Sequence, residues 1–116
     1  MITANVPTEE SEESDDLTIA LDEAGSHTTV RVGGELDSYT SIRLRGVLDD
    51  CLRRPIKRLA CNLAEVTFID SGGLGLLVST QRRAEAAGIM FVVTDPSPSV
   101  RRLFDMTGMS ERLLGS

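Results

Sequence analysis

The N-terminal part of the predicted domain alternates apolar and polar residues, the pattern of a strand with one buried face. Residues 17–22 (LTIALD) alternate in this way, and so do residues 28–32 (TTVRV). The five residues between them, Glu23 to His27, include a glycine, so the two segments are predicted to form a β-hairpin. The pair Gly33-Gly34 is predicted to end the second strand.

The middle of the chain changes to helical spacing and then returns to strands. Apolar residues fall mainly at helical intervals over residues 39–52, and Ser38 or Thr40 is the candidate N-cap. Residues 58–63 (RLACNL) are predicted to form a short buried strand. A turn at Ala64-Glu65 is predicted to separate this strand from the extended run VTFI.

The C-terminal part repeats the alternation of helix and strand. Helical spacing begins after Ser71 and stops at Gly88, the residue expected just beyond a helix end. Residues 89–94 (IMFVVT) carry no charge and are rich in β-branched side chains, which predicts a strand covered on both faces. A third helix is predicted to start near residues 96–99, and a short helical turn is expected around residues 111–114.

The predicted order is therefore β, β, α, β, α, β, α, followed by a further short helix. Two strands joined by a helix imply a parallel pair with a right-handed crossover. The fold class is accordingly α/β or α+β, with a small mixed β-sheet packed against about four helices in one domain.

Charge divides the chain into two unequal parts. The whole chain of 116 residues has a formal net charge of −6. Residues 1–16 hold six acidic residues and no basic ones, and the remaining hundred residues hold twelve of each. We predict a disordered acidic tail over residues 1–16 and a single neutral domain over residues 17–116.

Composition excludes several classes of function. A neutral domain with three Phe, one Tyr and no Trp is a poor candidate for binding nucleic acid. No apolar run approaches the roughly 20 residues of a membrane span, and no secretory signal is present, so a cytoplasmic location is predicted. Two cysteines, Cys51 and Cys61, do not make a disulfide framework and are interpreted as small core residues.

The most informative segment is Asp70-Ser71-Gly72-Gly73, where a predicted strand ends and a helix begins. Free amides and the positive end of the helix dipole would favour an anion there, including a phosphate on Ser71. The two glycines would leave room for a partner. Capping of the helix by Asp70 or Ser71 is the commoner reason for such a sequence.

The sequence lacks the further residues that an enzymatic role of this segment would need. A serine protease needs a histidine base on two β-barrels, and the single histidine, His27, lies in the predicted hairpin loop. A hydrolase elbow needs a glycine where Ile69 stands. A receiver-type phosphoacceptor at Asp70 needs a lysine after a later strand, but the only lysine, Lys57, precedes the third strand. We therefore predict no catalytic residue, no metal and no cofactor.

Three segments in order carry a resemblance to a known family. They are residues 32–37 (VGGELD), 68–75 (FIDSGGLG) and 97–108 (SPSVRRLFDMTG). Over about residues 17–114 the chain resembles the STAS domain, specifically the bacterial anti-sigma-factor antagonists, also called anti-anti-sigma factors.

The resemblance implies a non-enzymatic partner switch. The unphosphorylated protein would bind an anti-sigma factor that is also a serine kinase, and so release the sigma factor. The kinase would phosphorylate Ser71 and dissociate the complex, and a PP2C-type phosphatase would restore it. The free protein would be a monomer or a weak dimer.

The resemblance also assigns site residues. Asp37 matches the family aspartate in the turn beside the phosphorylation loop, although it is also a candidate helix cap. The predicted partner-binding set is Asp37, Asp70, Ser71, Gly72, Gly73 and Leu74. The family usually has a second Ser or Thr where this chain has Gly72. Ser71 is then the only acceptor in the loop, and the helix start is expected to be more flexible.

Two alternatives remain at this point. A STAS module could instead bind a nucleotide or another anionic ligand at the same helix N-terminus, or act as a scaffold in a signalling complex. Redox control through Cys51 and Cys61 ranks last, because their predicted elements do not place them together.

Overall fold

The computed structural model describes residues 16–114. The predicted acidic tail lies outside the described residues except for Asp16, which immediately precedes the first strand. The elements follow the predicted order and are, along the chain, β1 (Leu17–Ala24), β2 (His27–Leu36), α1 (Ser41–Leu52), β3 (Arg58–Ile69), α2 (Ser71–Ala86), β4 (Met90–Thr94), α3 (Pro98–Thr107) and α4 (Ser110–Leu114).

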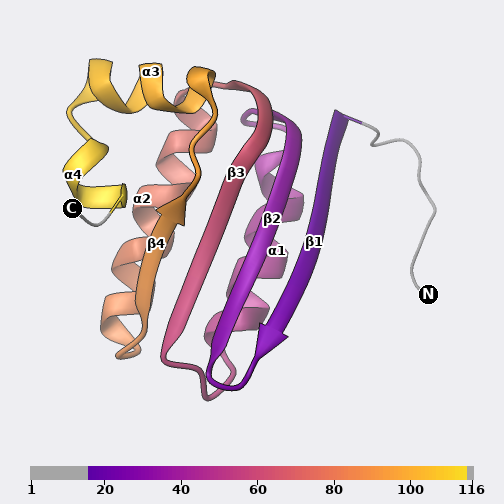
Figure 1. The fold of residues 1–116 in the computed structure, drawn as a ribbon, viewed down its shortest axis with the longest axis vertical. Coiled ribbons are helices and arrows are strands. Elements are labelled where there is room, and N and C mark those ends of the chain that lie inside the picture. Colours follow the sequence, from indigo (N-terminus) through magenta and orange to yellow (C-terminus); the bar gives the residue numbers. More distant parts are fainter. Residues whose placement is uncertain (1–15, 115–116) are drawn as a thin grey trace.

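The four strands form one mixed sheet in the order β1-β2-β3-β4. β1 runs antiparallel to β2, whereas β2, β3 and β4 are parallel to one another. Figure 1 shows α1 and α2 together behind the sheet, α3 near the ends of β3 and β4, and α4 beside β4. The predicted fold class, a small mixed sheet with four helices, is confirmed.

The core lies between the sheet and the helices. Each of the parallel strands contributes fully buried residues, among them Val30, Leu59 and Val93. They belong to one cluster with Leu48 of α1 and Leu77 of α2. Each buried side chain of this size contributes about 1.5–3 kcal/mol relative to leaving it in water, so this layer holds α1 and α2 against the sheet.

The hairpin is tighter than predicted. β1 and β2 pair without interruption as far as Ala24 and His27, which leaves only Gly25 and Ser26 in the turn. Gly25 has φ of +62°, and two-residue turns with positive φ match the twist of the two strands. The expected five-residue loop is therefore wrong, and His27 is an exposed residue of β2.

The glycine pair and the predicted turn both lie inside strands. β2 continues through Gly33 and Gly34, and β3 runs unbroken through Ala64-Glu65. The pairing of β2 with β3 shifts register twice, between Arg31 and Gly33 and between Gly34 and Glu35. Such bulges place extra residues on one strand without ending it. Gly34 has φ of +92°, which explains a glycine at this point of the strand.

Both cysteines are free and buried in the core, as predicted. Burial raises the pKa of the Cys61 thiol to about 12, and Cys51 adds a smaller contribution in the same direction. Both thiols belong to the same core cluster. Buried thiols with raised pKa values are poorly reactive, so redox control gains no support.

The remaining helices agree with their predicted signals. Gly88 (φ +74°) follows the end of α2, and Ser97 Oγ caps α3 by accepting a hydrogen bond from the amide of Val100 at 3.3 Å. Within residues 16–114 no helix is long and apolar enough to cross a membrane.

Candidate functional site

Two loops meet where the parallel strands β2 and β3 end. Leu36 is the last residue of β2 and pairs with Ile69, the last residue of β3. The amide of Asp70 donates to the carbonyl oxygen of Leu36 at 3.3 Å. The Asp37 turn and the Asp70–Leu74 segment, separated by more than thirty residues in sequence, are therefore neighbours at one end of the sheet. This is the end at which α/β proteins usually carry their sites.

Asp70 caps helix α2, as one of the sequence interpretations held. Its Oδ1 accepts hydrogen bonds from the amides of Gly72 at 2.8 Å and Gly73 at 3.1 Å. A carboxylate thus already occupies amides that an added anion would use, and it brings a negative charge with it. The amides of Gly72 and Gly73 are therefore not free to bind an added anion, although the sequence interpretation assumed free amides here. Phosphorylation of Ser71 stays a prediction.

Ser71 is the first residue of α2 and is exposed. Its hydroxyl makes no hydrogen bond with any of the residues that the structure describes. Leu74, one turn further along, is partly buried and packs against the core. The predicted acceptor is therefore presented to solvent from a helix that is firmly attached to the domain.

The two glycines of the loop bring backbones into close approach. A Cβ added at Gly73 would lie 2.6 Å from the carbonyl oxygen of Leu36. A Cβ added at Gly72 would lie 2.8 Å from the Cα atom of Ser38. Side chains do not fit at either position without movement. The two glycines therefore allow the two loops to pack closely against each other. The expected flexibility of the helix start stays a prediction.

Asp37 holds the turn that precedes α1. Its Oδ1 accepts hydrogen bonds from the amides of Tyr39 at 2.9 Å and Thr40 at 2.8 Å. The hydrogen bond from the Thr40 amide is the main reason why the pKa of the Asp37 carboxyl is lowered. The buried Thr40 hydroxyl donates to the carbonyl oxygen of Glu35 at 2.7 Å and caps no helix amide. α1 accordingly begins at Ser41, two residues later than predicted.

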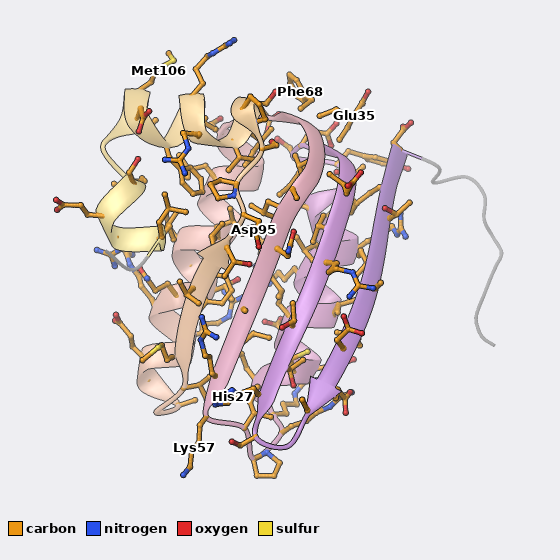
Figure 2. All side chains as sticks on the ribbon, in the orientation of Figure 1. His27, Glu35, Lys57, Phe68, Asp95 and Met106 are labelled. Carbon is orange, nitrogen blue, oxygen red and sulfur yellow. The ribbon has the colours of Figure 1, made fainter. Side chains whose placement is uncertain are left out.

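Exposed apolar side chains surround the two loops, and sequence reasoning missed them. The exposed fractions are 82% for Tyr39 and 71% for Ile42 on one side, and 48% for Phe68 and 75% for Met106 on the other. Figure 2 shows Phe68, Met106 and the acidic Glu35 at the same end of the molecule, opposite to His27 and Lys57. Ile42 has the helical spacing of a core residue in the sequence, yet it is exposed.

Two shallow grooves lie beside these side chains. One, of about 220 Å³, runs between the end of β3 and α3 and is lined by Phe68, Arg102 and Met106 among others. The other, of about 270 Å³, runs between α1 and α2 and includes Ile42 and Gly72. Residues 16–114 contain no cluster of three or more His, Cys, Asp or Glu side chains that could hold a metal ion.

Comparison with known families identifies the domain. A family model described as the STAS domain matches residues 18–114. The chain belongs to the STAS domain family. Its match covers both loops of the site and every helix and strand apart from the first residue of β1.

Relatives of this STAS domain narrow the family further. The "Anti-sigma F factor antagonist" of Paenibacillus polymyxa is 36% identical over 81 residues, covering 69% of this chain and 69% of the relative. The "Anti-sigma-B factor antagonist" of Staphylococcus epidermidis is 38% identical over 82 residues, covering 71% and 76%. The chain is thus a STAS protein of the anti-sigma factor antagonist type, a family of non-enzymatic regulators.

Solved structures show the same fold. Unphosphorylated SpoIIAA, an anti-sigma factor antagonist, superposes with a TM-score of 0.73 at 24% identity, covering 84% of this chain and 86% of the other. An anti-sigma factor antagonist from Mycobacterium paratuberculosis gives a TM-score of 0.72 at 25% identity, covering 85% and 84%. The resemblance drawn from the three sequence segments is confirmed.

Proposed function

We propose that this STAS protein binds a serine-kinase anti-sigma factor through the surface around Ser71, and so releases a sigma factor. Phosphorylation of Ser71 by that kinase ends the binding. The observation that carries the proposal is the position of Ser71, which is exposed on the first turn of a capped helix, directly before the Gly72 that packs against Ser38 of the Asp37 turn. Family membership supplies the partner class.

The apolar side chains around Ser71 supply the contact energy. Large exposed side chains such as Tyr39, Ile42, Phe68 and Met106 are the kind that form the buried centre of an interface. They stand on both sides of the loop, so a partner that covers Ser71 also covers them. The predicted binding residues Asp37, Asp70–Gly73 and Leu74 lie between or beneath them.

A phosphate on Ser71 would disrupt this interface by its charge. The kinase transfers the γ-phosphoryl group of ATP to Ser71 Oγ, ADP leaves, and the hydroxyl proton is released. The product carries about −1.5 to −2 charge units at neutral pH. The neighbouring Asp70 carboxylate already accepts from the amides of Gly72 and Gly73, so these amides cannot neutralise the phosphate. Covering an unpaired charge costs several kcal/mol, which is enough to separate the complex.

The remaining parts of the switch follow from the same proposal. A PP2C-type phosphatase in the cytoplasm hydrolyses the phosphoserine and restores binding. The protein acts as a domain spanning residues 17–116, as a monomer or weak dimer, without nucleic acid or membrane. The alternative of a nucleotide or anionic ligand at the start of α2 has less support, because the Asp70 carboxylate occupies the amides there.

The test uses the tagged full chain to isolate its partner from the source cells. The kinase-type protein that co-purifies is identified, expressed and measured by calorimetry with the parent chain and three variants. We expect Ser71→Ala to bind as the parent does but to accept no phosphate from ATP. We expect Ser71→Glu to bind about tenfold or more weakly, because it introduces one charge into the interface.

The control is Ser26→Ala, which removes a hydroxyl in the hairpin turn at the other end of the sheet. It should leave both affinity and phosphorylation unchanged. Phosphate transfer to Ser71→Ala, or parent-like affinity of Ser71→Glu, would contradict the proposed switch. A thermal shift with ATP alone would favour the ligand-binding alternative.

A further inference from the structure

The side chain of Ser38 occupies the space directly over Gly72. A Cβ added at Gly72 would lie 2.8 Å from the Cα and 2.9 Å from the Cβ of Ser38, and closer still to its hydroxyl oxygen. Separations below 3 Å between such atoms require something to move. The volume that any side chain at position 72 would fill is thus taken by a serine from the β2–α1 loop.

The position of Ser38 is fixed, although its hydroxyl is free. Asp37 Oδ1 holds the turn through the amides of the two residues after Ser38, and the Ser38 carbonyl accepts from Ser41 Oγ at 3.1 Å. Ser38 is exposed, and its own hydroxyl has no hydrogen-bond partner among residues 16–114. The hydroxyl is therefore held beside Gly72, the residue after Ser71, with its hydrogen-bonding capacity unused.

We propose that Ser38 is a recognition residue of the partner-binding surface, and that the bound anti-sigma factor forms a hydrogen bond with its hydroxyl. This inference rests on the proposed function and adds a specificity-determining position to it. Gly72 is the residue next to Ser71, so a partner that covers Ser71 also covers the side chain lying on Gly72. A hydroxyl covered without a hydrogen bond is destabilising, so a matched partner supplies one.

The arrangement also explains the glycine at position 72. In the resemblance drawn from the sequence, other antagonists usually carry a second Ser or Thr at this position. Here the second hydroxyl comes from the neighbouring loop and α2 provides only the space for it. A partner that is fitted to a hydroxyl on α2 would find the hydroxyl of this protein displaced onto the β2–α1 loop. The position of the hydroxyl would therefore discriminate between related partners.

The first test measures the geometry without any partner. Gly72→Ser is expected to lower the melting temperature, because its Cβ displaces the Ser38 turn. The loss should be clearly smaller when it is introduced together with Ser38→Gly, which removes two of the three closest atoms. Equal losses in both backgrounds would mean that Ser38 does not occupy the space over Gly72, and would overturn the inference.

The second test measures affinity for the purified anti-sigma factor identified with the parent chain. Ser38→Ala should fold as stably as the parent and bind about three- to tenfold more weakly, the effect of one lost hydrogen bond. Ser26→Ala, at the other end of the sheet, serves as the control and should bind as the parent does. Gly72→Ser should weaken binding further, and Ser38→Gly combined with it should recover part of the loss.

The outcomes separate the two proposals. If no kinase-type anti-sigma factor binds the parent chain, the proposed function fails. If the parent binds and Ser38→Ala binds with the same affinity, the proposed function stands and the role of Ser38 is refuted.

Discussion

Two strand-to-helix connections in this protein begin with an aspartate, and they use the same hydrogen bonds to different ends. Asp70 Oδ1 accepts from the amides two and three residues ahead, and both belong to α2. Asp37 Oδ1 accepts from the amides at the same relative positions, but these form a separate turn before α1. Asp70 therefore caps a helix that begins at the next residue, whereas Asp37 stabilises a turn that precedes its helix.

The packing around the two aspartates explains the difference. The first turn of α2 carries glycines, and its backbone lies directly against Leu36 and Ser38. The Asp37 turn is attached to the sheet through the buried Thr40 hydroxyl, and it leaves Tyr39 exposed. The start of α2 is thus the rigid part of the surface. The Asp37 turn packs against it and carries the exposed side chains. Binding surfaces need both, a rigid support and exposed anchors.

The largest effect on stability is expected from Gly73→Ala, which disturbs the packing of α2 against the end of β2. The added methyl group would lie 2.6 Å from the carbonyl oxygen of Leu36, so backbone must move, and overpacking of this kind costs about 1–3 kcal/mol. The matched control is Gly75→Ala in the same turn, which meets no atom within 4 Å and should raise stability by up to about 1 kcal/mol. Urea unfolding measures both. Equal effects of the two substitutions would show that the loops do not touch as described.

A smaller loss is expected from Asp70→Ala, which removes the helix cap. The amides of Gly72 and Gly73 lose their acceptor, and losing an N-cap costs about 0.5–2 kcal/mol in the free energy of unfolding. Asp70→Asn keeps the oxygen and should retain most of the stability at neutral pH. If Asn proved as destabilising as Ala, the carboxylate charge, and not the hydrogen bonds, would be the stabilising feature.

The smallest effect concerns Asp37 and appears only at acidic pH. The pKa of the Asp37 carboxyl is lowered from its ordinary value of 3.8, chiefly by the amide of Thr40. The folded state therefore favours the ionised form, so its contribution is present above pH 3.8 and is lost as the pH falls through the lowered pKa.

Thermal unfolding of the parent and of Asp37→Asn from neutral pH down to about pH 3 tests this assignment. The parent should lose stability relative to the variant over the acidic part of the range. Parallel curves would mean that Asp37 titrates alike in the folded and unfolded chains.

Local sequence signals were sufficient to predict much of the structure of this protein. The order of the elements, the start of α2 at Ser71 and its cap at Asp70 follow from residues close together in sequence, because capping and helical spacing act over only a few positions. The three segments that carry the family resemblance are local in the same sense. The end of α2 before Gly88 also needed no distant contact.

The sequence predictions were wrong where contacts between distant segments override the local conformational preference of the residues. Ala64-Glu65 and Gly33-Gly34 suggest turns when taken alone, but pairing between β2 and β3 absorbs both pairs as bulged strand. Ile42 has core spacing on its helix, yet the facing turn of α2 offers Gly72 and Gly75 in place of side chains, so Ile42 stays exposed.

By itself, then, the sequence determined the family, the element order and the identity of the candidate acceptor, since these depend on short-range patterns. Only the tertiary structure decided that Ser38 lies over Gly72, that Gly73 packs against Leu36, and that exposed apolar side chains flank the two loops. Those features arise because parallel pairing of β2 with β3 aligns Leu36 with Ile69, and so brings together two loops more than thirty residues apart.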